Sequence, residues 1–362
     1  RPTTYRRNLV VEIKIIPMKK RNLIIIICII IIIAVGLILL PKKRENSTIE
    51  IPPKEIKEKE KEISLQILRY EEDIFNIDKN NVVDELLKLS QTYPNFLPAD
   101  QIQNPNAIKA FMAYLNDPTV LELYKEVKNT FPNLDDFKQQ FTQAYSRYLV
   151  LFPNDKIPTI VTSVPGLDTQ WPSVFLYEND LNIYLDMYLG ADNKIYKQSG
   201  IPLYISERMD KKFLLVDCFK KAIVYKQLPE KTLVTLLDRV IYEGKKLYFT
   251  QTMLPNEPLE NIIGYNEEKF QWAEQNYGKV WAYIVENNLL YSKEENVIRQ
   301  FAEEAPFTNP FGNNSPGRMG QYIGWKIVSA YMQNNSEVTL EEMMKNTDSQ
   351  NILNNSKFKP TK

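Results

Sequence analysis

Glu243 and Gly244 interrupt the apolar side of a stretch, LLDRVIYEGKKLYF (residues 236–249), that otherwise has the spacing of an amphipathic helix. Glu243 shares one helix face, at i, i+4, i+7 and i+11, with Leu236, Val240 and Leu247. A carboxylate on a buried face needs a cation, a proton or a metal. Arg239, four residues earlier, could form an ion pair with Glu243, and Gly244 suits a close backbone contact. A core ion pair beside a packing glycine and a functional carboxylate both fit this pattern.

The chain has no histidine and only two cysteines, Cys28 and Cys218, among its 362 residues. Without histidine, neither a Ser-His-Asp or Cys-His catalytic system nor an HExxH zinc site can form. Two cysteines cannot make a metal cluster, and Cys28 lies in an apolar run, so a disulfide is not expected. Cys218 is most simply a small buried side chain. We therefore predict no catalytic residues, no metal ligands, no cofactor and no enzymatic activity.

A second candidate site is NNSPGRMGQYIGWKIVSAYM (residues 313–332). Ser315 as N-cap and Pro316 as first helical residue predict a helix start. One face of this helix then carries glycines at i, i+3 and i+7, namely Gly317, Gly320 and Gly324. This face predicts a groove for another segment, and Trp325 beside it is included as a candidate interaction residue.

Arg318 lies in the first turn of the same predicted helix, where the helix dipole disfavours a cation. This position predicts an acidic partner, either within the protein, with Glu243 as one candidate, or on a ligand. A solvated Arg318 beside simple helix packing is the alternative.

The elements that would position these residues are mostly helices. Helical spacing of apolar residues predicts helices at residues 63–75, 81–94, 111–127, 134–149, 210–226, 230–249, 258–277, 279–289, 293–304 and 317–333. Alternating or β-branched residues predict strands at residues 157–164, 173–179 and 181–190. With no internal repeat and no second linker, residues 63–362 are expected to form one α+β domain, mainly helical with a small central sheet.

An uninterrupted apolar run, LIIIICIIIIIAVGLILL (residues 23–40), precedes this domain. As a helix it would span about 27 Å, close to the thickness of a bilayer core, so it predicts a transmembrane anchor. Residues 1–22 form a basic segment in which Met18 resembles a natural start, with residues 1–17 as an upstream extension. Residues 41–62 form a charged linker, helical from Lys54 onward. A lipoprotein anchor at Cys28 is the lesser alternative, because Ile27 stands where a small residue is required.

The charge is unevenly distributed along the chain. Residues 1–40 contain seven Lys and Arg and one acid, which leaves 38 basic and 44 acidic residues for the remainder, a net charge of −6. An acidic body is not typical of a nucleic-acid-binding protein. We therefore expect a membrane and other proteins, but no nucleic acid, as partners.

Seven segments, in order along the body, resemble the gliding-motility lipoprotein GldB family of Bacteroidetes. They are GLDTQWPSVFLYENDLNIYLDMYLGADNKIY, IPLYISERM, LLDRVIYEGKKLYFTQTMLP, WAYIVENNLLYS, APFTNPFG, PGRMGQYIGWKIVSAYM and DSQNILNNSKFKP. The resemblance covers roughly residues 63–362. It implies a cell-envelope protein associated with gliding motility and, by association, with type IX secretion. The uncleaved anchor favours the inner membrane, with the body in the periplasm.

The family in turn resembles zinc peptidases that have an HExxH helix followed by a helix with a Glu-Gly pair. This resemblance implies a zincin-like fold in which Glu243-Gly244 occupies the position of the third metal ligand. The helix at residues 211–225 would correspond to HExxH, but it holds Asp217, Cys218 and Lys221 and no histidine. Glu243 is therefore interpreted as the remnant of a metal ligand, now partnered by protein groups.

The leading hypothesis is a non-catalytic pseudopeptidase that acts as an interaction component for motility or secretion proteins of the envelope. One alternative is a carboxylate-dependent hydrolase of cell-wall glycan, which needs two acids about 5–10 Å apart across a cleft. Glu243 with Glu178, Asp180 or Asp186 could supply them. The other alternative is an envelope protein that binds a ligand in the former active-site groove.

Overall fold

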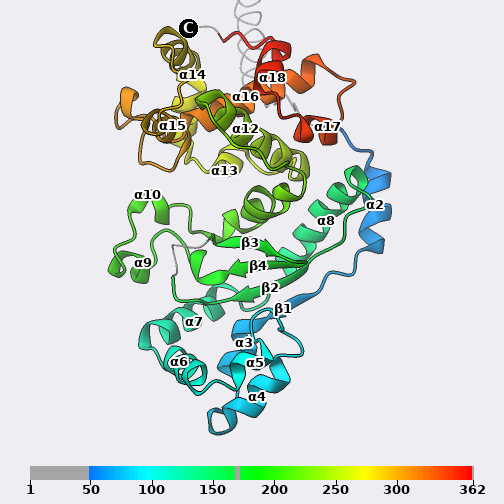
Figure 1. The fold of residues 1–362 in the computed structure, drawn as a ribbon, viewed down its shortest axis with the longest axis vertical. Coiled ribbons are helices and arrows are strands. Elements are labelled where there is room, and N and C mark those ends of the chain that lie inside the picture. Colours follow the sequence, from blue (N-terminus) through cyan, green and yellow to red (C-terminus); the bar gives the residue numbers. More distant parts are fainter. Residues whose placement is uncertain (1–48, 168–171, 361–362) are drawn as a thin grey trace, which may run out of the picture. The chain divides into compact units, whose positions relative to one another are not determined.

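The computed structural model describes residues 49–167 and 172–360. The predicted anchor at residues 23–40 and the basic segment before it lie outside this part of the chain. Among the helices of the described residues, none combines the length and apolar character needed to cross a membrane. The described residues form an α+β fold, mostly helical, with one small mixed sheet (Figure 1).

The sheet has four strands in the order β1-β2-β4-β3. Their bounds are β1 (Ile67–Arg69), β2 (Thr159–Ser163), β3 (Val174–Tyr177) and β4 (Asp180–Tyr184). β1 and β4 pair with β2 in parallel, whereas β3 pairs with β4 as an antiparallel hairpin. β2 and β3 fall within predicted ranges. The strand predicted at residues 181–190 begins one residue earlier, at Asp180, and ends at Tyr184, where the 3₁₀ helix η2 (Leu185–Met187) follows.

The prediction of a helix over residues 63–75 is wrong for its first half. Residues 67–69 form β1, and the helix α3 occupies only Tyr70–Phe75. Ile67, Leu68 and Arg69 pair with residues 160–162 of β2. A partner strand more than 90 residues away supplies these backbone hydrogen bonds, so a short helical pattern is overridden by tertiary pairing.

Helices of the first part of the chain precede or follow β1. They are α2 (Pro53–Glu62), η1 (Lys79–Asn81), α4 (Val82–Leu89), α5 (Ala99–Ile102), α6 (Pro105–Leu115), α7 (Pro118–Thr130) and α8 (Asp135–Leu151). The helix predicted at residues 111–127 is two helices, because Asp117 caps the second one and Pro118 opens it. The helical start in the charged linker is confirmed as α2, which packs against α8.

Short helices connect the sheet to the rest of the body. They are α9 (Lys194–Gln198), α10 (Leu203–Ser206), η3 (Lys211–Phe213), α11 (Leu214–Asp217), the π-helical turn η4 (Cys218–Ala222) and η5 (Ile223–Lys226). The predicted helix at residues 210–226 is thus broken into four pieces of different pitch. The π-helical turn lies where Lys220 is drawn into the interior to bond the carbonyl of Ile262. A single π-helical turn interrupts the regular α-helical geometry and changes the direction in which the following side chains point.

The C-terminal part is helical throughout. Its elements are α12 (Leu236–Met253), α13 (Leu259–Ile263), α14 (Glu267–Glu286), α15 (Glu295–Ala302), η6 (Asn309–Phe311), α16 (Met319–Asn334), α17 (Leu340–Lys345) and α18 (Ser349–Ser356). The predicted boundary between residues 277 and 279 is wrong, since Gly278 lies buried inside α14. The break falls at Gly264 instead, whose positive φ ends α13.

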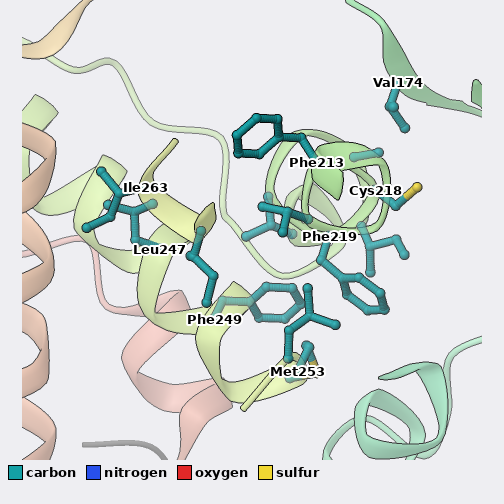
Figure 2. Packing of buried hydrophobic residues seen from close by; sticks show 14 of the residues in the cluster. Val174, Phe213, Cys218, Phe219, Leu247, Phe249, Met253 and Ile263 are labelled. Atoms are coloured by element: carbon teal, nitrogen blue, oxygen red, sulfur yellow. The ribbon is translucent and has the colours of Figure 1, made fainter. Parts of the chain in front are cut away.

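The larger of two core clusters extends from the sheet to these helices, and a smaller one, which includes Tyr70, Ile74 and Val161, joins β2 to the helices α3–α6. In Figure 1 the strands are placed between α3–α7 and the helices from α12 onward. Figure 2 shows Phe249 and Met253 of α12 pointing toward the segment that carries Phe213 and Phe219. Cys218 in this segment is fully buried, which confirms its prediction as a small apolar side chain. The core therefore fixes α12 against the broken helix at residues 211–226.

Candidate functional site

Glu243 lies in the middle of α12, a helix that begins with a capping box of Thr235 and Asp238. Its side chain is 12% exposed and is enclosed by two cations. Lys246 Nζ lies 3.0 Å from one carboxylate oxygen, and Arg239 Nη1 lies 3.9 Å from the other. Arg239 is the predicted partner, but Lys246, which was not predicted, is the closer one. Its i+3 spacing from Glu243 was a usable signal.

Besides Glu243, two tyrosine side chains hold Lys246 in place. Burial alone would lower the pKa of Lys246, but the Glu243 carboxylate and the Tyr225 hydroxyl together hold it above its usual value. The ammonium donates to the Tyr225 hydroxyl at 3.2 Å and lies over the rings of Tyr225 and Tyr242. Glu243 is thus part of a nearly enclosed cation–anion pair rather than a free carboxylate.

Gly244 and Gly324 bring α12 and α16 into backbone contact. A Cβ built on Gly324 would stand 1.9 Å from the carbonyl oxygen of Val240, and one on Gly244 would stand 2.2 Å from the carbonyl carbon of Gly324. One turn earlier, a Cβ built on Gly320 would stand 2.8 Å from the carbonyl oxygen of Phe301 in α15. α12 packs most extensively against α16 among all helices of the described residues.

Trp325 adds a polar link across the same contact. Its indole Nε1 donates a hydrogen bond of 2.8 Å to Oε1 of Gln251, near the end of α12. The ring is almost fully buried, and the ammonium of Lys326 lies 5.0 Å from its centroid. Gly244, Gly324 and Trp325 therefore belong to one helix–helix interface, whereas the two cations that hold Glu243 lie on α12 itself.

Arg318 has Glu304 as its direct acidic partner, and the charge of Glu243 acts on it only as a minor influence. The helix α16 begins only at Met319, so the predicted start at Ser315 and Pro316 is wrong, and Gly317 lies before the helix. The reason is a loop closure, in which the Ser315 hydroxyl bonds the backbone of Thr308 and of Gly312. A left-handed φ of 59° at Arg318 then turns the chain into α16.

The Arg318 side chain closes the C-terminal end of α13. Nη1 donates to the carbonyl of Ile263 at 2.9 Å and Nη2 to that of Gly264 at 3.1 Å, where a cation complements the helix dipole. Its acidic partner is Glu304, with Nε 3.2 Å from Oε1, and Arg208 binds the other oxygen of the same carboxylate. Burial, reinforced by the neighbouring Arg208, lowers the pKa of Arg318.

Arg208 and Glu304 were not singled out by the sequence analysis. They are 96 residues apart and lie 110 and 14 residues from Arg318 respectively, so no spacing rule relates the three. Burial works against ionisation of Glu304, yet Arg318 and Arg208 together hold its pKa below the usual value. Only the folded chain brings this trio together.

A second buried polar group centres on Asp217, which precedes the π-helical turn. Its Oδ2 accepts a hydrogen bond from Tyr188 at 2.9 Å and from Lys221 at 2.7 Å. Ser173 in turn lies 2.9 Å from the Tyr188 hydroxyl. Burial opposes ionisation of Asp217, but the neighbouring lysines outweigh it and lower its pKa. Asp217 and Lys221 thus form an ion pair at i,i+4 on the segment compared above with HExxH.

The other carboxylates weighed as partners for Glu243 have surroundings of their own. Glu178 lies in the exposed turn between β3 and β4. Asp180 accepts a hydrogen bond from Asn95, and the buried Asp186 accepts the backbone N–H groups of Gly166 and Leu167. In the part of the chain that the structure describes, no three His, Cys, Asp or Glu residues gather closely enough to hold a metal ion.

Most of the chain matches a described protein family. The family model described as gliding motility protein GldB matches residues 52–360. No curated protein and no solved structure matches the chain.

Proposed function

The chain belongs to the family of the gliding motility protein GldB, and from this premise we propose that it acts as a non-catalytic interaction component of the cell envelope. Family membership implies involvement in gliding motility. Anchoring in the inner membrane, a periplasmic body, a pseudopeptidase origin and a link to type IX secretion belong to the proposal.

The observation that carries the non-catalytic role is the state of Glu243. A catalytic carboxylate must reach substrate or a bound metal, and it must be free to exchange a proton or hold a ligand. Glu243 is instead enclosed between Lys246 and Arg239. Asp217, on the segment that corresponds to HExxH in the peptidase plan, is likewise paired with Lys221. Both positions have the character of structural ion pairs.

The glycan hydrolase alternative loses support on the same ground. Hydrolysis of a glycosidic bond requires two carboxyl groups that flank an accessible substrate. Glu243 has a cation beside each of its carboxylate oxygens. Asp180 on β4 and Asp186 on η2, which could have been the second acid, accept hydrogen bonds from other parts of the fold. We therefore favour an interaction role over a hydrolytic one.

The substitution Glu243→Gln tests this role. Breaking a buried ion pair costs about 3 kcal/mol, because the remaining charge is left without its partner. The variant should melt at a lower temperature, and gliding should fall in proportion to the amount of folded protein in the envelope. The measurements are a thermal melt, an immunoblot and a colony-spreading assay on the same strain.

Glu303→Gln is the matched control, because Glu303 forms only an exposed pair with Arg299. Exposed pairs contribute about 0–1 kcal/mol, so this variant should melt and glide like the unchanged protein. A Glu243→Gln protein that is fully stable and abundant, yet does not support gliding, would contradict the structural role. It would instead favour a carboxylate that acts on a substrate or ligand.

A further inference from the structure

A cavity of about 250 Å³ lies where the segment after α10 meets the α13–α14 junction and the loop before α16. It is separate from the contact between α12 and α16, although Arg318 lines one wall. Its volume lies below the range of about 300–1,000 Å³ that is typical of pockets for drug-sized ligands. It therefore suits a group of amino-acid size rather than a drug-sized ligand.

The charged residues around this cavity are mainly basic. Four cationic side chains line it, namely Arg208, Lys212, Lys269 and Arg318, against two acidic ones, Glu207 and Glu304. The Glu304 carboxylate forms ion pairs with both Arg208 and Arg318. Lys269 Nζ binds only carbonyl oxygens, those of Asn313 and Ser315. The lining thus carries a surplus of two positive charges, and an anion would reduce it.

The cations around the cavity also repel one another. Burial is the main cause that lowers the pKa values of Lys220 and Arg318, and in both cases the nearby Arg208 lowers them further. Lys220 lies behind the lining and donates to the Ile262 carbonyl. Protein interiors usually pair such charges. Glu304 pairs with both arginines and Asp217 offsets Lys220, so the uncompensated charge is that of the lining, which keeps its surplus of two cations and favours a bound anion.

Lys212 is the cation best placed to meet a ligand. It is exposed and lines the cavity, and among the described residues its ammonium contacts the face of the Phe213 ring, 4.9 Å from the centroid, and no acidic side chain. The cavity walls also carry Tyr204, Tyr265 and Pro306, which provide apolar surface for a carbon skeleton. Glu304 demonstrates that a planar carboxylate fits between the arginines here.

We propose that this cavity is a binding site for a carboxylate on a short carbon chain, with Arg208 and Lys212 as the principal cations. The ligand class includes the acidic side chain or the C-terminal residue of a peptide. This inference goes beyond the proposed interaction role, since that role does not require any small-molecule site.

The test uses the full chain purified in detergent, at constant ionic strength. Glutarate, a five-carbon dicarboxylate, is titrated by calorimetry beside glutaramide, its neutral isostere, and inorganic phosphate. Glutarate should bind and raise the melting temperature, glutaramide should give no signal, and phosphate should bind more weakly than glutarate. Equal binding of glutarate and glutaramide, or tighter binding of phosphate, would overturn the proposal, as would the absence of any glutarate binding.

Two neighbouring lysines provide a matched pair of variants. Lys212→Gln removes a cation from the lining and should weaken glutarate binding about fivefold, the effect of losing one partly screened charge contact. Lys211→Gln removes an equally exposed charge that does not line the cavity, and its affinity should match that of the unchanged protein. Equal weakening by both variants would reveal only general charge attraction and would refute a site. A variant that loses gliding but still binds glutarate would leave the site intact and would bear only on the proposed function in motility.

Discussion

At the residue scale, the fold surrounds several charged side chains with specific partners. Glu243 is matched by Lys246, Arg318 by Glu304 and Asp217 by Lys221. Lys245 is different, because it is 4% exposed and its partners are two carbonyl oxygens, those of Met344 and Asn346. Carbonyl groups bind an ammonium without neutralising it. A neutral amine can make the same two hydrogen bonds, so this lysine is suited to lose its proton on folding.

Lys245 therefore predicts a dependence of stability on pH. Burial, aided by Lys231, lowers the pKa of Lys245 to about 7 in the folded state, whereas an unfolded lysine titrates near its usual value of 10.5. Between these two values the unfolded chain binds a proton that the folded chain lacks. The free energy of unfolding should thus rise with pH in this window, by at most about 1.4 kcal/mol per pH unit. Below pH 7 the destabilisation is fully present.

Chemical unfolding of the full chain at pH 7, 8 and 9 measures this slope. Lys220 also has a lowered pKa and contributes with the same sign, so Lys245→Met should reduce the slope rather than abolish it. Lys293→Met, at an exposed position, is the control and should leave the slope unchanged. An identical slope in the unchanged protein and in Lys245→Met would refute the proton release at Lys245.

At the element scale, the contact of α12 with α16 is set by glycines rather than by large apolar side chains. The backbones approach so closely that a single methyl group cannot be accommodated at Gly324. Phe249 of α12 points toward the segment that carries Phe219, whereas Gly244 of the same helix meets the backbone of Gly324 in α16. Small residues allow close helix approach, and the polar link from Trp325 to Gln251 then fixes the relative position of the two helices.

A graded series of alanine substitutions tests this interface. Gly324→Ala places Cβ 1.9 Å from the carbonyl oxygen of Val240 in α12. Gly320→Ala places Cβ 2.8 Å from the carbonyl oxygen of Phe301 in α15 and 3.1 Å from a methyl group of Val240, so it probes the contact of α16 with both helices. Overpacking costs about 1–3 kcal/mol and more where backbone must move. Gly324→Ala should therefore destabilise the protein by about 3 kcal/mol and Gly320→Ala by clearly less, as measured by chemical unfolding. The reverse order, or two neutral variants, would show that the helices are not held at this distance.

At the scale of the whole molecule, the chain divides into an anchor predicted from sequence and the folded body from residue 49 onward. The helix α2 is the first described element of this body, and it packs against α8 with none of its own residues buried. Basic clusters flank the apolar run on both sides, at residues 19–21 and 42–44. Such a balance of basic residues does not favour either orientation of the predicted anchor in the membrane. The orientation is therefore predicted from the proposed envelope role.

We predict that the body from Lys42 onward lies outside the cytoplasm, with the N-terminus inside. Protease added to spheroplasts should then digest the body, because the inner membrane offers it no protection. A cytoplasmic marker protein, followed in the same samples, controls for lysis. Protection of the body until the membrane is dissolved by detergent would refute this orientation.

Some properties follow from the sequence alone because they depend on local order or on composition. The absence of histidine excludes whole classes of catalytic site whatever the fold. Helical spacing located most helices, since an amphipathic pattern reflects one buried face per turn. The glycines at 320 and 324 could be recognised as one face of a helix for the same reason. The i+3 spacing of Glu243 and Lys246 was equally readable.

Other properties were decided only by tertiary structure, because they depend on residues that are distant along the chain. β1 forms because β2 offers it hydrogen bonds, which overrides a helical pattern. Arg318 pairs with Glu304 and not with Glu243, because the Ser315 loop delays the helix start and a left-handed residue redirects the chain. The cavity beside Arg208 joins five segments, at residues 191, 204–213, 264–269, 304–306 and 316–318, that no spacing rule connects. Periodicity reports which face of an element is buried, but long-range packing alone selects what lies against it.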